Sequence, residues 1–256
     1  MRPVRRGLAI GLLLAVWHVA TTWDLDFYVR FQNVPAPAQV VEEAVALFGS
    51  TGFYVHILAS LERIWLGFTI ATGLGVGLGL LIGWFRFAED TLFPPIELLR
   101  PIPAVAWVPL SIMLWPTERS SIVFITTLGA FFPIVLNTIH GVEGIDRQLV
   151  RAATSLGAGR AAVFREVVIP GALPSIVTGL SVGMGVSWLC LISAEMISGQ
   201  FGVGYFTWVA YGIVKYSHIV VGMLVIGVLG MLSSTFIRLI GARCMPWLPR
   251  RVKDGA

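Results

Sequence analysis

Long apolar runs separated by short charged stretches dominate the pattern of this chain. A helix needs about 20 apolar residues to cross the hydrocarbon core of a bilayer, and it satisfies its own backbone hydrogen bonds there. Each apolar run therefore predicts one spanning helix, although the third run is short and interrupted by prolines. The runs cover residues 7–23, 64–85, 100–115, 121–141, 176–197 and 218–240. We expect an all-α integral membrane protein with about six transmembrane helices, in a single domain over residues 1–256.

The first apolar run has two interpretations. It follows Arg2, Arg5 and Arg6, and a basic start before an apolar stretch is also typical of a secretory signal peptide. The run is long for a signal peptide, and no A-x-A cleavage pattern precedes Asp24. We expect the segment to be retained as the first span, with a removed signal peptide as the alternative.

The longest charged interruption lies between the fourth and fifth apolar runs. Residues 147–156 repeat apolar positions at helical spacing with arginines opposite, which predicts an amphipathic helix. Gly157 ends this helix. Residues 160–168 predict a second short helix, and Pro170 marks the return to the membrane. The pattern predicts a helix-turn-helix elbow outside the membrane; an ordinary solvated loop is the alternative.

Three other segments interrupt the spans. Residues 24–52 contain an amphipathic stretch around 40–48, which suits a helix lying along the bilayer surface. Residues 199–217 are rich in glycine and aromatic side chains, and they predict an interfacial loop or a re-entrant turn. Residues 86–100 predict a short polar loop.

Basic residues are distributed unevenly over the two sides that these spans define. With the N-terminus inside, the inner side contains residues 86–100, 142–170 and the tail 243–256, where most of the 18 lysines and arginines fall. Such an excess is typical of cytoplasmic loops. We therefore expect both termini and the elbow in the cytoplasm, and residues 24–52 and 199–217 on the periplasmic side. The small positive balance follows from this orientation and predicts no nucleic-acid partner.

The sequence offers no catalytic or metal-binding constellation. The pattern GxSxG at residues 179–183 lies inside an apolar helical run and predicts a packing face, because a nucleophile elbow needs a strand-to-helix turn. The 4 histidines are scattered, and the 2 cysteines form no CxxC pair. Neither lysine follows GxxxxG, so we expect no P-loop ATP hydrolysis in this chain. These absences predict a protein that is not an enzyme and has no metal or cofactor of its own.

One carboxylate falls within an apolar run. Glu195 lies near the outer end of the fifth predicted span, and an intramembrane carboxylate is a functional candidate by default. It either lines a solute path or holds the glycine-rich segment that follows. Arg63 is a further candidate for the path or its gate, with an anchoring charge or the partner of Glu195 as alternatives. Trp107 and Trp188 are further candidates to line a path, with packing roles as the alternative.

The elbow carries a motif with a specific spacing. R-A-A-x3-G-x9-V-x-I-P begins at Arg151 and ends at Pro170. It resembles the EAA motif, E-A-A-x3-G-x9-I-x-L-P, of permease subunits in binding-protein-dependent type I ABC importers. The departures are Arg151, Val167 and Ile169 in place of Glu, Ile and Leu. The resemblance implies contact with an ATPase through Arg151, Ala152, Ala153, Leu156, Gly157, Arg160 and Pro170.

Three further stretches resemble the nitrate, sulfonate and taurine branch of these permeases. They are residues 60–68, the proline-rich 100–109, and 188–196. The resemblance implies the type I ABC importer permease fold in the cell inner membrane and a homodimer of this chain. It also implies two cytoplasmic ATPase subunits that carry ATP and Mg, with residues 147–170 as the coupling region.

The same resemblance implies a periplasmic binding protein that delivers a small solute, an anion such as nitrate, sulfonate, taurine or bicarbonate. Two functions from other classes remain as alternatives. A secondary transporter would work without an ATPase and needs ionisable groups along its path. A structural membrane-assembly protein would not need the elbow.

Overall fold

The computed structural model describes residues 2–23 and 33–247, and every regular element in this part of the chain is helical. This confirms the all-α prediction. The elements are α1 (Arg2–Thr22), α2 (Pro37–Phe48), α3 (Thr51–Trp84), α4 (Arg86–Leu99), η2 (Ala104–Trp107), α5 (Val108–Leu114), α6 (Glu118–Glu143), α7 (Arg147–Ser155), α8 (Arg160–Val163), η3 (Phe164–Val168), α9 (Ile169–Ser198), α10 (Val203–Gly212) and α11 (Tyr216–Cys244).

Four helices in the described ranges are long and apolar enough to cross a membrane. They are α3, α6, the continuous helix Arg160–Ser198, and α11. A fifth span is obtained if α4 and the η2–α5 segment, which meet at 85°, count as one bent span. α1 adds a shorter apolar helix, Gly11–Thr22. The structure therefore gives four or five spans among the described residues, and the first predicted span lies within α1, Arg2–Thr22.

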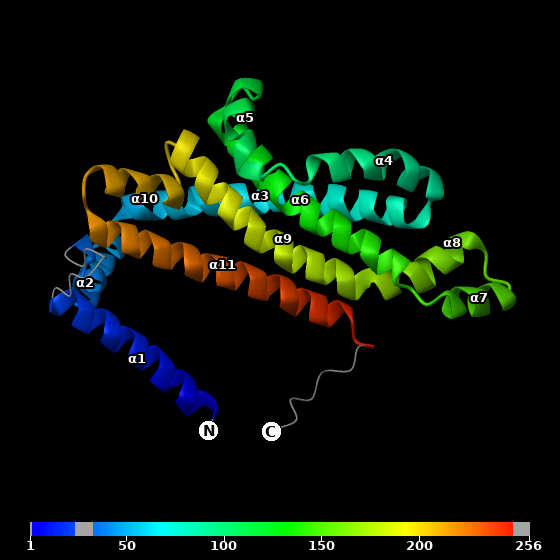
Figure 1. Cartoon of the computed structure of the whole chain (residues 1–256), viewed down its shortest axis with the longest axis horizontal. Helices are drawn as coiled ribbons and strands as arrows, with labels where there is room; N and C mark the ends of the chain where they lie inside the picture. The colour runs from blue at the N-terminus through cyan, green and yellow to red at the C-terminus, as the bar shows by residue number, and fades with distance from the viewer. Residues whose placement is uncertain (1, 24–32, 248–256) are drawn as a thin grey trace.

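α6 lies at the centre of the bundle, between α3 and α9 (Figure 1). Small residues allow α3 to approach α6 closely, because a Cβ at Gly75, Gly79 or Gly83 would overlap α6 side chains. Gly73 and Gly77 instead face open space. α3 therefore packs on α6 through only one row of its glycines.

The GxSxG pattern at residues 179–183 serves the same packing on α9. A Cβ at Gly179 or Gly183 would overlap atoms of α6. The Ser181 hydroxyl donates to the Val177 carbonyl at 2.9 Å, inside its own helix. These contacts confirm the predicted packing face.

Residues 86–100, predicted as a polar loop, instead form the helix α4 alongside α3 (Figure 1). The prediction was wrong because Pro94, Pro95 and the charged residues argue locally against a helix. Ile96 is buried in a cluster shared with α3 and α6. Tertiary packing therefore outweighs local propensity in this segment.

The helix that begins at Arg160 runs through the π-helical turn η3 into α9 without interruption. Pro170 is therefore not the helix boundary that we predicted. It directly follows the π-helical turn, in which the Ile169 N–H donates to the carbonyl of Phe164, five residues back. This turn is wider than an α-helical one and leaves space for the proline ring.

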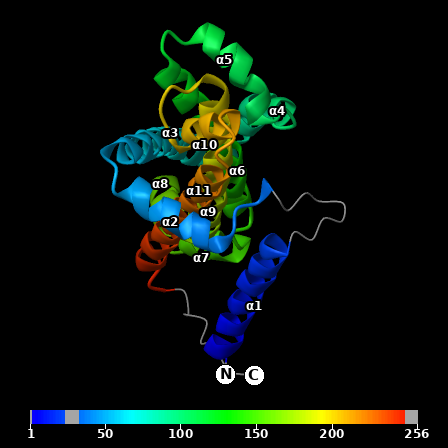
Figure 2. The same ribbon diagram turned by 90° about the vertical axis from the view of Figure 1, so that its left-hand side faces the viewer.

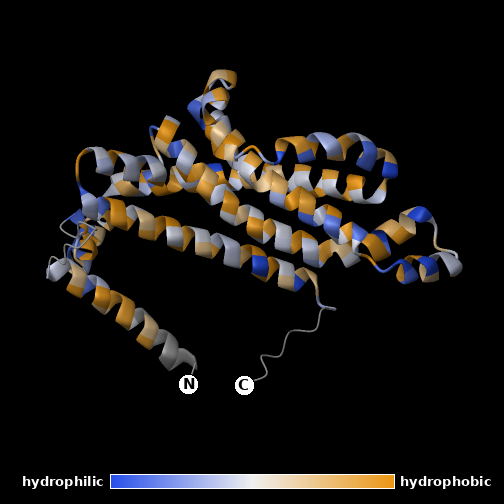
Figure 3. Ribbon diagram, viewed as in Figure 1, coloured by the Kyte–Doolittle hydropathy of each residue, from blue (hydrophilic) through white to orange (hydrophobic). Residues whose placement is uncertain are grey.

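The two ends of the bundle differ in character. α7 and α8 project beyond one end, whereas α2 and α10 lie at the other (Figure 1). Hydrophilic residues are concentrated in α7, while the long helices are mainly apolar (Figure 3). α1 stands apart from the bundle in the view along it and meets the rest of the chain at α2 (Figure 2). Of the predicted tail 243–256, residues 248–256 lie outside the described residues.

α2 is the amphipathic helix predicted around residues 40–48. Val40 is buried against α3 and α11, whereas Val41 and Val45 are exposed. Residues 24–32, the first part of the predicted outer segment, lie outside the described residues. The segment 199–217 contains the helix α10, which packs on α11, α9 and α3.

Candidate functional site

The elbow between α6 and α9 is the first candidate site. The Asp146 side chain caps α7 by accepting the Gln148 amide at 2.8 Å. One face of α7 packs back on the bundle through Val150 and Ala153. The opposite face, with Gln148, Arg151 and Ser155, is exposed, and Leu149 at the edge of the packed face is exposed too. α7 is thus a short amphipathic helix whose outer face has no cover within the described chain.

A Schellman motif ends α7. The Gly157 N–H donates to the Thr154 carbonyl at 3.0 Å. The Ala158 N–H donates to the Ala153 carbonyl at 3.1 Å. Gly157 has a φ of +87°, a conformation that favours glycine. The motif places Leu156 at the tip of the elbow, where its side chain is 89% exposed.

Basic side chains surround this tip. Arg147, Arg151 and Arg160 are exposed, and none of them takes part in an ion pair between described residues. Ala152 is also exposed and adds little bulk beside Arg151. The tip therefore combines positive charge with a bare leucine.

Apolar packing connects the elbow to the spanning helices. Val163 and Val168 are buried in one cluster with Val142, near the end of α6. The Phe164 ring lies 5.5 Å, centroid to centroid, from the ring of Trp84 at the end of α3. The elbow therefore contacts the ends of α3, α6 and α9 through apolar side chains.

A second candidate site surrounds Glu195, towards the other end of the bundle. Its side chain is completely buried. The carboxylate accepts hydrogen bonds from the Arg63 guanidinium at 3.0 Å, the Gly204 amide at 3.0 Å and the Ser60 hydroxyl at 2.9 Å. An ionised carboxylate only accepts hydrogen bonds, so this set of donors matches the charged form of Glu195.

Arg63 joins Glu195 to a second carboxylate and to the backbone after α9. One of its terminal nitrogens lies 3.3 Å from Glu118 at the start of α6. The other donates to the Phe201 carbonyl at 2.6 Å. Glu118 also accepts the Gln200 amide at 2.8 Å. One guanidinium on α3 therefore links α6, α9 and the segment that follows α9.

Residues 199–204, the turn between α9 and α10 together with the first two residues of α10, are called the hairpin below. Its backbone amides donate to side chains of α3: Val203 to the Ser60 hydroxyl at 2.9 Å, and Gly202 to Nδ1 of His56 at 3.2 Å. Side chains from α3, α6 and α9 thus bind the backbone of the hairpin, and the side chain of Val203 is buried.

Gly202 allows the hairpin to approach Glu195, and Gly202→Ala is expected to destabilise the protein by about 1–3 kcal/mol. Gly202 has φ 122° and ψ 160°, a region occupied almost only by glycine, and a Cβ would overlap the Glu195 carboxylate. Thermal unfolding in detergent measures the effect against Gly227→Ala, whose Cβ would meet nothing within 4 Å. Equal unfolding midpoints for the two variants would contradict the prediction.

The family of proteins described as "Binding-protein-dependent transport system inner membrane component" matches residues 71–250. This range includes the elbow, Glu195, the hairpin and α10. The chain belongs to this family. The permease is accordingly a multi-pass component of the inner membrane and a transport protein.

Curated relatives of the permease cover nearly its whole length. It is 38% identical over 239 residues to a putative ABC transporter permease of Methanocaldococcus jannaschii, covering 93% of this chain and 89% of the relative. It is 33% identical to the nitrate import permease NrtB of Synechocystis, covering 96% and 90%. It is 33% identical to the taurine transport permease TauC of Escherichia coli, covering 93% and 87%.

The permease also resembles a solved structure in fold. It matches a chain of the MetNI methionine ABC transporter in an inward-facing form, with a TM-score of 0.59 and 19% sequence identity. The match covers 76% of this chain and 95% of that chain. The predicted type I ABC importer permease fold is confirmed.

The permease holds the predicted path residues mostly in its interior. Arg63 and Glu195 bind one another. Trp188 is 4% exposed, and its indole N–H donates to the Ser233 hydroxyl of α11 at 3.2 Å. Trp107 is half-buried against the main core. A position on the solute path stays a prediction for all four residues.

Glu118, His56 and Gly202 of the permease were not singled out from sequence. Glu118 lies three residues before the fourth predicted run, whereas His56 lies eight residues before the second. Grouping polar residues near the ends of the predicted runs would have brought Glu118, but not His56, near Glu195. For Gly202, no sequence signal distinguishes it from its neighbouring glycines.

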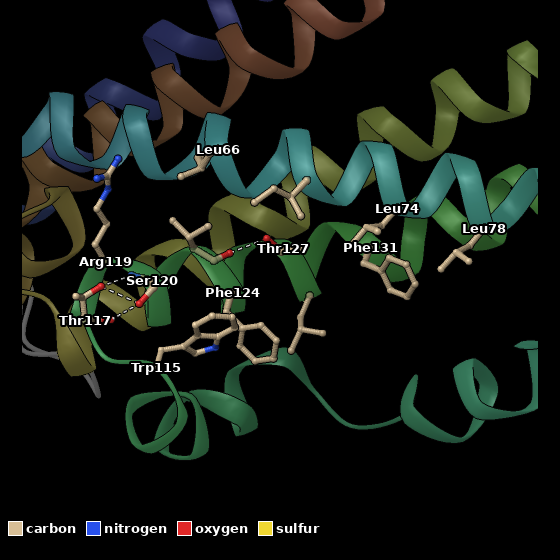
Figure 4. A pocket seen from close by; sticks show the side chains of 13 residues that line it. Leu66, Leu74, Leu78, Trp115, Thr117, Arg119, Ser120, Phe124, Thr127 and Phe131 are labelled. Carbon is tan, nitrogen blue, oxygen red and sulfur yellow. Dashed lines mark hydrogen bonds between the residues drawn. The ribbon is translucent and has the colours of Figure 1, made fainter.

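A cavity of about 680 Å³ lies between α3 and α6, beside Trp115 (Figure 4). Most of its lining is apolar, with Arg119, Thr117 and Ser120 at one end. A buried anion needs hydrogen-bond donors or cations around it. This cavity suits an apolar side chain or a lipid tail better than an anionic solute.

Proposed function

We propose that two copies of the permease form the translocation path of an ATP-driven importer, and that residues 147–170 couple this path to a separate ATPase. The observation that carries the proposal is the bare tip of the elbow. Leu156 is 89% exposed beside three exposed arginines, and this combination favours a partner surface. The family description, a binding-protein-dependent transport system, supports a periplasmic binding protein as the donor of the solute.

The tip also specifies the chemistry of its partner. Leu149 and Leu156 fit an apolar pocket, whereas Arg147, Arg151 and Arg160 favour an acidic rim around it. The expected partner is therefore an ATPase with a groove that is apolar at its base and acidic at its edge, on the cytoplasmic side. ATP and Mg would bind to that subunit.

We propose a small anion or sulfonated molecule as the solute, such as nitrate, sulfonate, taurine or bicarbonate. Relatives named for nitrate, taurine and aliphatic sulfonates support this class. Within the described chain, the buried cationic side chain is Arg63, and two carboxylates already engage it. A path between two copies, with selection made by the binding protein, is consistent with this arrangement.

The same charges weigh against a secondary transporter. Such a protein needs ionisable groups along its path. The buried charged side chains of the described residues are Arg63 and Glu195, which pair with each other. The importer therefore agrees better with the geometry.

Affinity purification from the native membrane tests the proposal. Tagged permease, solubilised in a mild detergent and analysed by mass spectrometry, is expected to retain a P-loop ATPase at about one copy per permease, because a stable interface of standard size survives mild detergent. The purified assembly is then expected to hydrolyse ATP faster when a solute-loaded binding protein is added. Repeated recovery of the permease alone would overturn the proposal and favour the secondary transporter.

A further inference from the structure

We propose that Arg63 and Glu195, with Ser60, form an outer clamp that holds the hairpin, and that release of this clamp is the step that opens the outer end of the path. Arg63 and Glu195 are then positioning residues for transport. The role in transport rests on the proposed importer function, whereas the holding of the hairpin does not.

The first argument is that side chains from more than one helix form hydrogen bonds with the hairpin. Arg63 on α3 binds the Phe201 carbonyl, Ser60 on the same helix accepts the Val203 amide, and Glu195 accepts the Gly204 amide. Arg63 and Ser60 also bind Glu195 directly. The clamp is therefore one connected network, and loss of a single member weakens several bonds to the hairpin.

The second argument is the chemistry of the contact. The long helices pack on one another through apolar and small residues, whereas the hairpin is held by an ion pair and hydrogen bonds in addition to the buried side chain of Val203. A buried ion pair is weak evidence for stability and is better suited to specifying one of two arrangements. Polar groups can also bind water when they separate, so the opened state is accessible.

The third argument is that Arg63 has a second carboxylate within reach. Glu118 lies 3.3 Å away and its side chain is 23% exposed, whereas the Glu195 side chain is completely buried. When the hairpin lifts, Arg63 can keep Glu118 as its partner at the edge of the bundle. Arg63 on α3 and Glu195 on α9 can stay paired at the same time, so the opened state leaves neither charge unpaired.

Cysteine labelling in the purified, intact assembly tests whether the clamp holds the hairpin. The reporter is Val203→Cys, because Val203 is completely buried in the hairpin, in a background carrying Cys244→Ser to remove the exposed cysteine. Glu195→Gln replaces one acceptor oxygen by a donor, and labelling by N-ethylmaleimide is expected to become about ten- to a hundredfold faster. The chain with Cys190 alone gives the background.

A matched pair on the surface supplies the control. Glu62 and Arg119 pair next to Arg63 and Glu118, one residue along the same two helices, and both side chains are more than half exposed. Glu62→Gln is expected to leave the labelling rate of the reporter unchanged. Ser60→Ala, a smaller change that removes the acceptor of the Val203 amide, is expected to accelerate labelling as Glu195→Gln does.

Transport separates a positioning role from a merely structural one. In Glu195→Gln, uptake is expected to fall about tenfold while ATP hydrolysis without binding protein rises, because the outer end no longer waits for a loaded binding protein. A structural defect would lower both rates in parallel. Unchanged labelling in Glu195→Gln and Ser60→Ala, or faster labelling with normal uptake, overturns the inference. If no ATPase is recovered, the proposed function fails, and the labelling experiment still decides whether the clamp exists.

Discussion

The Leu156→Asp variant is expected to lose its ATPase partner without losing its fold. Leu156 is 89% exposed at the tip of the elbow, so its replacement removes almost no contact within the permease. In the assembly the same side chain is expected to fill an apolar pocket, where loss of an anchor costs about 2 kcal/mol or more, roughly a 30-fold loss of affinity. An added carboxylate also faces the acidic rim proposed for the partner.

Co-purification of the ATPase and uptake in cells both measure this effect. Ala46→Asp is the matched control, because it adds the same charge at an exposed position of α2, at the opposite end of the bundle (Figure 1). The control is expected to retain the partner and to transport normally. Detergent unfolding midpoints of both variants are expected to equal that of the parent, since surface changes are usually within about 0.5 kcal/mol. Normal ATPase recovery with Leu156→Asp would remove the elbow from the interface.

Of the single substitutions described, Arg63→Met is expected to destabilise the permease most. It leaves the carboxylate of Glu195, which is completely buried, without its cation. Removing one partner of a buried ion pair typically costs about 3–5 kcal/mol. For a chain of this size that corresponds to a fall of roughly 10 °C in the unfolding midpoint.

Two further variants separate charge from packing. Glu195→Gln in the Arg63→Met background is expected to recover more than half of the loss, because no ionised group is then left buried and unpaired. Arg119→Met removes the arginine of an exposed pair, whose side chains are 58% and 57% exposed, and is expected to cost about 0–1 kcal/mol. Equal midpoints for Arg63→Met and Arg119→Met would mean that burial of the pair has no energetic consequence.

The elbow could be predicted from sequence because its signals are local. Asp146 caps α7 two residues before the amide that it binds, and Gly157 provides the positive φ that ends the helix. The amphipathic pattern of α2 was likewise visible within a single helix. In each case a single short stretch of sequence contains all the residues on which the prediction depends.

The clamp could be predicted only in part, because its partners are far apart along the chain. Ser60 and Glu195 are separated by 135 positions, and Arg63 and Glu195 by 132. The sequence suggested a pair with Glu195 as one of several roles for Arg63. It gave no indication of where Glu118 or the hairpin would lie. α4 was missed for a related reason, since the packing that stabilises it comes from α3 and α6 rather than from its own residues.

The uninterrupted helix from Arg160 to Ser198 is also a lever that reaches from the elbow to Glu195. Its 39 residues, at about 1.5 Å each, make it roughly 58 Å long. A tilt of about 5° around one end would move the other end by roughly 5 Å. That displacement is larger than the length of any hydrogen bond in the clamp, which ranges from 2.6 to 3.0 Å. The lever has two compliant points, the π-helical turn η3 and Pro174. If the helix bends at these two points, a movement of the elbow displaces the Glu195 end by less than this rigid-helix value.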